Sequence, residues 1–237
     1  MTFDQTKWVW MNGELVRWDE ATVHASAHTL HYGSGVFEGI RCYETDSGPA
    51  LFRLGEHLNR LAFSASVYGM LIPYSKEELQ DAIDETIARN GFESCYVRPI
   101  CFHGTGGLSL DPKACPVQTV ILAFPWGKYL GDEAVMGGVR LTVSSWTRFH
   151  SGMVPTNAKG CGQYVNSILA AREAHQRGYD EALMLDASGH IAEGSGENLF
   201  IVKSGEILTN NEQSSILPGI TRGSVLQIAA DADYSVT

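Results

Sequence analysis

The chain has 237 residues, of which 44% are hydrophobic and 19% charged, and its formal net charge is −10. This is the composition of a globular protein with one large domain or two smaller ones and a sizeable core. The acidic balance, without a run of basic residues, argues against nucleic acid or an anionic membrane as a partner, and no apolar stretch approaches the ~20 residues of a membrane-spanning helix.

The first half of the chain is expected to form a small α+β domain. Asn12-Gly13 lies between two β-type runs and is a strong signal for a tight hairpin. Ser75 and Glu78 form a capping box that opens a helix, and Gly91 follows its end. The predicted elements are strands at 8–11 and 14–17, helices at 54–68 and from 75 to 90, and strands at 95–102 and 117–124.

The second half is expected to form a second, separate domain. Residues 127–138 are rich in glycine and acidic residues and are interpreted as the linker, so the domains are predicted at 1–126 and 139–237. The predicted elements after the linker are a strand at 139–145, a helix at 163–177, strands at 181–185, 199–202 and 206–208, and a helix at 220–230. The fold class is therefore α+β with two domains.

Lys159 is the first candidate for chemistry. Apart from His150, it is the only charged side chain between Arg148 and Arg172. A lysine with no acid nearby in sequence can lose its hydration and act as a neutral nucleophile. Small residues flank it, among them Gly160, and leave room for a planar ligand. The ordinary alternative is a solvated surface lysine, which is the commoner case.

Two further segments follow in an informative order. Glu193 precedes three small residues, which leave room for a flat ring beside its carboxylate. Residues 217–222 form a turn leading into a helix start, where backbone N–H groups can hold a phosphate. Each segment also has an ordinary explanation, as a strand-end carboxylate and as a helix cap at Thr221. An amine, an acid and a phosphate-binding turn together predict pyridoxal phosphate.

Other ligand classes are not expected. His24, His28 and His31 have the spacing of a helical metal face, but residues 32–35 disfavour a continuing helix and no acidic ligand lies nearby. The stretch from Gly104 to Gly107 lacks the spacing and the lysine of a phosphate-binding nucleotide loop. No metal and no nucleotide are therefore predicted.

The chain resembles the branched-chain amino-acid aminotransferases, which are pyridoxal-phosphate enzymes of fold type IV. The resemblance runs from Trp8 to about Ala230. Its strongest stretches are residues 31–41, Tyr96-Val-Arg-Pro99, residues 123–127 and the three segments described above.

The resemblance implies a role for each matching residue. Lys159 resembles the lysine that attaches the cofactor and moves a proton between Cα and C4′, and Glu193 resembles the carboxylate that pairs with the pyridine nitrogen. The remaining cofactor contacts implied by the resemblance are Tyr164 to the 3-oxygen and Arg60, Ile220 and Thr221 to the phosphate.

For the substrates, the resemblance implies branched-chain L-amino acids and 2-oxoglutarate. Arg98 is expected to bind the side-chain carboxylate of 2-oxoglutarate or glutamate. The apolar side chain of the donor is expected to contact Phe37, Tyr96, Trp126 and Tyr129, with Tyr32 supplied by a second subunit of a homodimer.

The resemblance also implies a longer chain. The family continues with strands and a Gly-Thr-Ala turn that contacts the phosphate, and no such turn follows Arg222. We therefore expect a C-terminally shortened enzyme with weakened cofactor binding and apolar residues of the last helix, such as Val225 and Ile228, left exposed. The alternatives are an inactive scaffold or another fold-type-IV enzyme, a D-amino-acid aminotransferase or aminodeoxychorismate lyase, although Tyr96-Val-Arg-Pro99 favours the branched-chain group.

The cysteines and the N-terminus predict a cytoplasmic protein. The five cysteines are odd in number and include no Cys-x-x-Cys pair, which is typical of reduced thiols in the cytosol. The first ten residues lack a cationic head followed by an apolar stretch, so no signal peptide is predicted.

Overall fold

The computed structural model describes residues 3, 6–127, 132–211 and 213–237 and divides into two compact units. Unit 1 comprises residues 1–129 and 158–162, and unit 2 comprises residues 130–157 and 163–237. No helix in the described ranges combines the length and the apolar character needed to cross a membrane. All five cysteines are free thiols, as predicted.

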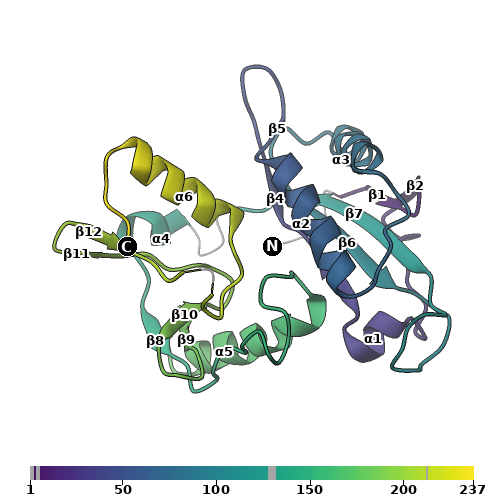
Figure 1. Cartoon of the computed structure of the whole chain (residues 1–237). Coiled ribbons are helices and arrows are strands. Elements are labelled where there is room, and N and C mark those ends of the chain that lie inside the picture. Colours follow the sequence, from purple (N-terminus) through teal and green to yellow (C-terminus); the bar gives the residue numbers. More distant parts are fainter. Residues whose placement is uncertain (1–2, 4–5, 128–131, 212) are drawn as a thin grey trace. The chain divides into compact units, whose positions relative to one another are not determined.

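Unit 1 is built on one sheet, which has seven antiparallel strands among the described residues (Figure 1). Its strand order is β2-β1-β7-β6-β4-β5, and β3 pairs with the remaining length of β6. The strands are β1 (Trp8–Met11), β2 (Glu14–Arg17), β3 (Gly35–Phe37), β4 (Ile40–Tyr43), β5 (Ala50–Leu51), β6 (Cys95–His103) and β7 (Val117–Phe124); the helices are α1 (His28–Tyr32), α2 (Leu54–Val67) and α3 (Lys76–Asn90).

The local signals of this unit form as predicted. Asn12 and Gly13 both have positive φ in the β1–β2 turn, the conformation that Asn-Gly hairpins require. The Ser75 hydroxyl accepts from the Glu78 N–H at 3.1 Å, and the Glu78 carboxylate accepts from the Ser75 N–H at 2.7 Å. Gly91 ends α3 in the left-handed conformation. Interactions between residues close in sequence therefore fix the β1–β2 turn and both ends of α3.

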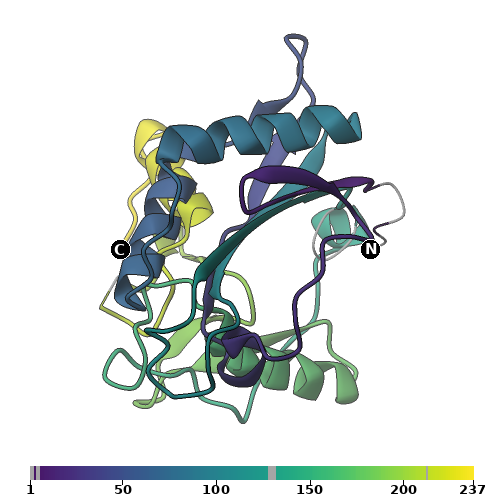
Figure 2. The ribbon, with the colours of Figure 1, turned by 90° about the vertical axis from the view of Figure 1, so that its right-hand side faces the viewer.

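The long strand β6 separates the core from the functional face. Its odd-numbered residues, such as Val97 and Cys101, belong to the main core, together with Leu61 of α2 and Ile83 of α3. Both helices lie on the same side of the sheet (Figure 2). Because side chains alternate along a strand, Tyr96 and the other even-numbered residues face the opposite side.

A short segment from later in the chain joins unit 1, in contrast to the expected boundaries. Residues 158–162, including Lys159, belong to unit 1 rather than to the second domain. The Phe37 N–H donates to the Lys159 carbonyl at 3.1 Å, and Val36 and Gly160 form an antiparallel bridge. The segment thus pairs with β3 and extends the sheet there. The paired residues are more than a hundred positions apart in the chain, so no local sequence pattern predicts this pairing.

Unit 2 contains a small three-stranded sheet and a hairpin among its described residues. In the sheet, β9 lies between β8, to which it is parallel, and β10. The elements are α4 (Asp132–Gly137), β8 (Leu141–Val143), α5 (Tyr164–Gln176), β9 (Glu181–Leu185), β10 (Ile191–Gly194), β11 (Ile201–Lys203), β12 (Glu206–Leu208) and α6 (Ile220–Asp231), with a 3₁₀ turn at Cys161–Gln163 before α5. Part of the predicted linker is therefore helical, as α4, and β10 was not anticipated.

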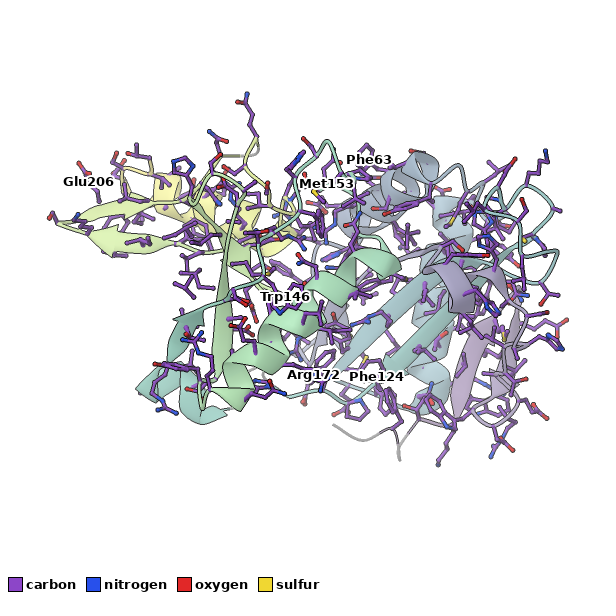
Figure 3. The ribbon with its side chains drawn as sticks, turned by 90° about the horizontal axis from the view of Figure 1, so that it is seen from below. Phe63, Phe124, Trp146, Met153, Arg172 and Glu206 are labelled. Atoms are coloured by element: carbon purple, nitrogen blue, oxygen red, sulfur yellow. The ribbon has the colours of Figure 1, made fainter. Side chains whose placement is uncertain are left out.

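Small residues let α5 pack closely on this sheet. Ala170 and Ala174 of α5 form a core with Ala182 and Met184 of β9. Glu206, at the turn of the β11–β12 hairpin, points away from the rest of its unit (Figure 3). On α6, Ala229 is buried, whereas Val225 and Ile228 are exposed. The last helix therefore presents apolar side chains to solvent, as expected from the sequence.

Candidate active site

The backbone of Lys159 is held from two sides. Its N–H donates to the Ser64 hydroxyl of α2 at 2.9 Å, and its carbonyl accepts from Phe37 of β3. The following residue must be glycine, because a Cβ on Gly160 would lie 2.3 Å from the Tyr68 hydroxyl oxygen. The glycine thus serves close packing against α2, a reason for it that the sequence pattern did not reveal.

The environment of the Lys159 amine favours its neutral form. Burial lowers its pKa from 10.5 to about 8, and the positive charges of Arg60 and Arg98 add to this effect, against the opposing influence of Glu38. Its Nζ lies 5.1 Å from the centroid of the Phe37 ring. An amine with this pKa is partly deprotonated near neutral pH and can act as a nucleophile or base.

Glu38 is the buried acid of unit 1, and its side chain is fully inaccessible. Arg60 Nε and Nη2 donate to its two carboxylate oxygens at 2.6 and 2.9 Å, and His57 Nδ1 lies 2.7 Å from Oε2. Burial by itself raises the pKa of Glu38, but these hydrogen bonds outweigh burial and lower it to about 2. The paired charges therefore anchor Arg60, which is one of the predicted phosphate contacts.

The face of the sheet opposite α2 and α3 carries the predicted substrate residues. The centroid of the Phe37 ring lies 4.5 Å from the Arg98 guanidinium carbon. The ring centroids of Tyr96 and Trp126 lie 4.4 Å apart. Arg98 Nη2 donates to the Tyr96 hydroxyl at 3.4 Å, while its Nε is buried and has no partner among the described residues. An apolar wall with one cation can receive either an aliphatic or an anionic side chain.

A further arginine fixes the aromatic part of this face. Arg41 donates through Nη1 to the Trp126 carbonyl at 2.5 Å and through Nη2 to the Gly127 carbonyl at 2.6 Å. Its guanidinium also lies 5.6 Å from the centroid of the Tyr96 ring. Arg41 therefore sets the position of both aromatic residues.

Of the other two predicted substrate residues, Tyr32 stands apart from this group. Tyr32 ends α1, is exposed, and donates from its hydroxyl to the Leu108 carbonyl at 2.9 Å. Tyr129 lies outside the described residues. The structure therefore groups Phe37, Tyr96, Arg98 and Trp126 on one face and leaves Tyr32 elsewhere.

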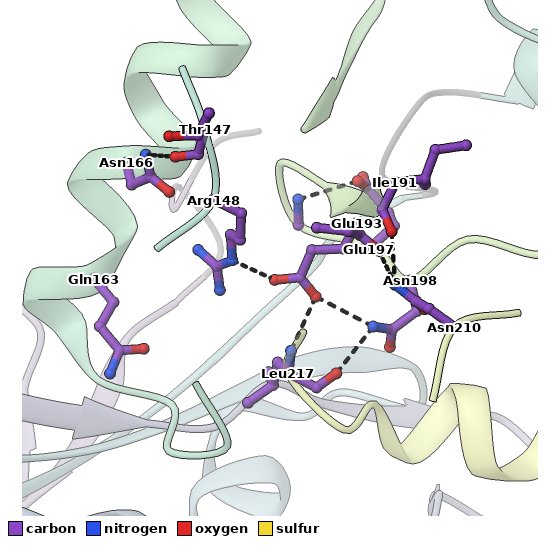
Figure 4. Close-up of polar contacts among 12 residues, drawn as sticks. Thr147, Arg148, Gln163, Asn166, Ile191, Glu193, Glu197, Asn198, Asn210 and Leu217 are labelled. Carbon is purple, nitrogen blue, oxygen red and sulfur yellow. Dashed lines mark hydrogen bonds and ion pairs between the residues drawn. The ribbon is translucent and has the colours of Figure 1, made fainter. Parts of the chain in front are cut away.

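Unit 2 holds the predicted pyridine-binding acid in a polar network (Figure 4). Arg148 forms an ion pair with Glu193 Oε1 at 2.7 Å. Glu193 Oε2 accepts from the Asn198 side-chain amide at 3.2 Å and from the Leu217 N–H at 3.0 Å. Glu193 is buried, and these contacts favour its ionised form. An ionised, fixed carboxylate can hold a proton on a heterocyclic nitrogen.

The same network connects Glu193 to the predicted phosphate turn. Asn198 also donates to the Leu217 carbonyl at 2.9 Å, and a Cβ on Gly219 would lie 2.1 Å from the Asn198 side-chain oxygen. Gly219 caps α6, so Ile220 and Thr221 form its first turn, where backbone N–H groups and the helix dipole favour an anion. Tyr164 is the first residue of α5.

The structure adds residues that the sequence did not single out. Glu38 lies inside a family motif but carried no signal of its pairing with Arg60, and Arg148 was noted only as the edge of an uncharged stretch. Asn198 follows Glu193 by five residues, and its amide joins the two cofactor segments. Each acts through a contact that only folding creates.

Sequence comparison and structure comparison both find aminotransferases as the proteins similar to this chain. The family model "Amino-transferase class IV" matches residues 35–237. The branched-chain-amino-acid aminotransferase of Pseudomonas aeruginosa is 46% identical over 228 residues, which are 96% of this chain and 74% of that protein. The Escherichia coli K12 enzyme of the same name is 45% identical over 237 residues, which are 100% and 77%.

Solved structures agree with these relatives. The crystal structure of the E. coli branched-chain amino acid aminotransferase has a TM-score of 0.96 at 44% identity, covering 98% of this chain and 77% of that chain. The T.th. enzyme of the same name, solved with pyridoxamine 5′-phosphate, has a TM-score of 0.93 at 50% identity, covering 98% and 76%.

Proposed function

This chain belongs to the amino-transferase class IV family, and we propose that it transfers amino groups between branched-chain L-amino acids and 2-oxoglutarate. It is a transaminase of fold type IV, and its cofactor is pyridoxal 5′-phosphate. The observation that supports the proposal most directly is the face of unit 1 on which the Lys159 amine and the Arg98 guanidinium both approach the Phe37 ring.

The residues present fit this cofactor. Unit 1 contributes an amine whose pKa is lowered to about 8 and the anchored cation Arg60. Unit 2 contributes the ionised Glu193, the first turn of α6 and the phenol of Tyr164. When bound, the cofactor supplies a ring that takes up the electrons released as the Cα–H bond breaks.

The protein residues position the reactants and move protons. Lys159 attaches the cofactor and carries the proton removed from Cα, which its lowered pKa permits. Glu193 keeps a proton at the pyridine nitrogen, and Arg148 and Asn198 hold that carboxylate in place. These contacts do not depend on the substrate, so they serve both half-reactions.

The same face accounts for both substrates. Phe37, Tyr96 and Trp126 offer apolar area to the side chain of leucine, isoleucine or valine. Arg98 binds the side-chain carboxylate of glutamate or 2-oxoglutarate, for which its buried Nε, unpaired among the described residues, is a suitable donor. We infer a cytoplasmic homodimer in which Tyr32 serves the site of the second copy.

Attachment of the cofactor to Lys159 is the first test. Reduction of the enzyme with borohydride should fix the cofactor covalently, and mass spectrometry of the peptides should locate it on Lys159. Lys159→Ala should abolish both the adduct and turnover, whereas Lys113→Ala, at an exposed site, should change neither. An adduct on another lysine in the Lys159→Ala protein would contradict the assignment.

A donor screen distinguishes the alternatives. With 2-oxoglutarate as acceptor, L-leucine, L-isoleucine and L-valine should be used, and D-alanine and aminodeoxychorismate should not. Preference for either of the latter two would indicate another fold-type-IV activity. If the purified protein shows no cofactor absorption after incubation with pyridoxal phosphate, the inactive-scaffold alternative holds.

A further inference from the structure

Unit 2 holds a second, partly buried carboxyl group beside Glu193 that the proposed reaction does not use. Glu197 lies four residues after Glu193, at the end of the turn that follows β10. The Gly194 N–H donates to the Glu197 carbonyl at 2.7 Å, and the Gly196 N–H donates to Glu197 Oε2 at 3.1 Å. Glu197 therefore closes this turn with both its backbone and its side chain.

The carboxyl group is tightly packed in the turn. A Cβ on Gly194 would lie 2.6 Å from Glu197 Oε2. The glycine next to Glu193 therefore leaves the space that the Glu197 carboxyl group occupies. Asn198, which holds Glu193 Oε2, is the next residue along the chain. A displacement of Glu197 would therefore also move Asn198 and its hydrogen bond to Glu193.

The other carboxylate oxygen of Glu197, Oε1, is buried and accepts no hydrogen bond from an N–H or hydroxyl group of the described residues. The group within hydrogen-bonding range is another carboxyl, that of Glu181 on β9, a residue only 5% exposed. Two carboxylates are both acceptors and cannot bond to each other, so a hydrogen bond between them requires a proton on one.

The surrounding charges favour that proton. Besides Glu181, Glu193 also acts on Glu197, and its charge is negative too. The nearby cation Arg148 is engaged by Glu193 at 2.7 Å. Burial first, and then the negative charge of Glu181, raise the pKa of Glu197 to about 7. Full ionisation would place a third negative charge beside those of Glu181 and Glu193.

We propose that Glu197 is a neutral carboxylic acid in the folded protein at neutral pH, that it donates its proton to Glu181, and that this shared proton positions the turn behind Glu193. Glu197 is thus a positioning residue. The inference deepens the proposed function, and only its last part rests on the role of Glu193 in holding the cofactor.

The proton has a measurable signature in folding. Because the unfolded Glu197 ionises near pH 4.5 and the folded one near pH 7, the folded state keeps a proton that the unfolded state has lost. The free energy of unfolding should therefore fall as pH rises from about 4.5 to about 7, with release of about one proton on unfolding, and then level off.

The first experiment uses the purified chain without substrate. Infrared spectra at neutral pH should show the carbonyl band of a protonated carboxylic acid, and this band should vanish as pH rises past about 7. Glu197→Gln should lack the band and the proton release while remaining folded, because an amide can donate to Glu181 and accept from Gly196. Glu206→Gln, at the exposed hairpin, should match the wild type in both.

A second variant checks the partner. In Glu181→Gln the amide can donate to an ionised Glu197, so the acid band should disappear although Glu197 is still present. A band that persists in Glu197→Gln, or that survives unchanged in Glu181→Gln, would overturn the shared proton.

The positioning role needs a readout of its own. In the wild type, the absorption spectrum of the bound cofactor and the leucine rate should both change with an inflection near pH 7, and this inflection should be absent in Glu197→Gln. An identical inflection in both proteins would overturn the positioning role. If leucine is not a donor at all, the proposed function fails, whereas the infrared and unfolding measurements still decide the proton.

Discussion

One glutamate in each unit, Glu38 in unit 1 and Glu197 in unit 2, shows protonation behaviour opposite to that of the other. In unit 1, Glu38 is fully buried, yet two hydrogen bonds from Arg60 and one from His57 lower its pKa to about 2. In unit 2, Glu197 is partly buried, but a second carboxyl faces it and its pKa is raised to about 7. Burial raises both pKa values, and the neighbouring group decides the outcome.

The comparison explains how one chain maintains two kinds of environment. In unit 1, the buried charge of Glu38 is paired with Arg60, which fixes Arg60, and the pKa of the Lys159 amine is lowered to about 8. In unit 2, Glu193 takes the available cation, Arg148, and the next carboxyl must keep its proton. The predictions below test this contrast in order of decreasing expected effect.

Removal of the acid from unit 1 should have the largest effect on stability. Glu38→Ala leaves Arg60 and His57 without their buried partner, and an uncompensated buried charge costs about 3–5 kcal/mol. Denaturant unfolding should show this loss. Glu56→Ala removes an exposed acid of the neighbouring helix α2 that pairs with Arg53 and should change stability little. Equal losses in the two variants would contradict the role of the buried pair.

The pH dependence of stability should differ in sign between the two glutamates. For Glu38, the unfolded chain takes up a proton near pH 4.5 and the folded chain only near pH 2. Its stabilising contribution, of about 3 kcal/mol, should therefore be present above pH 4.5 and be lost as pH falls to about 2. For Glu197, stability should instead fall as pH rises from about 4.5 to about 7.

Denaturant titrations at several pH values measure both effects. Glu38→Gln should remove the acid-side slope alone, and Glu197→Gln should remove the slope toward neutral pH alone. If one substitution flattened both slopes, the two glutamates would not titrate independently.

Glu193→Gln should slow the chemical step. The amide cannot hold a positive charge at the pyridine nitrogen, so the rate of Cα deprotonation should fall by about 10²-fold or more. Single-turnover kinetics with L-leucine measure this step, and Glu206→Gln is the control in the same unit. An unchanged single-turnover rate would refute the role of Glu193.

The aromatic face of unit 1 should control substrate choice. Phe37→Ala or Tyr96→Ala should weaken transition-state binding of leucine by about 1–3 kcal/mol. The loss for glutamate should be smaller, because Arg98 holds its carboxylate. Steady-state kcat/KM values for the two donors provide the comparison, and equal losses would count against an apolar pocket.

The sequence by itself determined several local elements and the family. The Asn12-Gly13 turn and the Ser75–Glu78 capping box were predicted correctly because a few adjacent residues settle them. The two long strands of unit 1 were located by their runs of apolar residues. The resemblance rested on ordered motifs, and the comparisons confirm it.

Only the tertiary structure decided how these parts work together. Lys159 joins unit 1 through Ser64 and Phe37, which lie about a hundred residues earlier in the chain, so a division at the linker could not place it. The pKa values of Glu38 and Glu197 likewise depend on Arg60 and Glu181, partners 22 and 16 positions away in the chain. Sequence patterns record which groups are present, whereas the electrostatic environment of a buried group is the sum over neighbours that folding brings within a few ångströms.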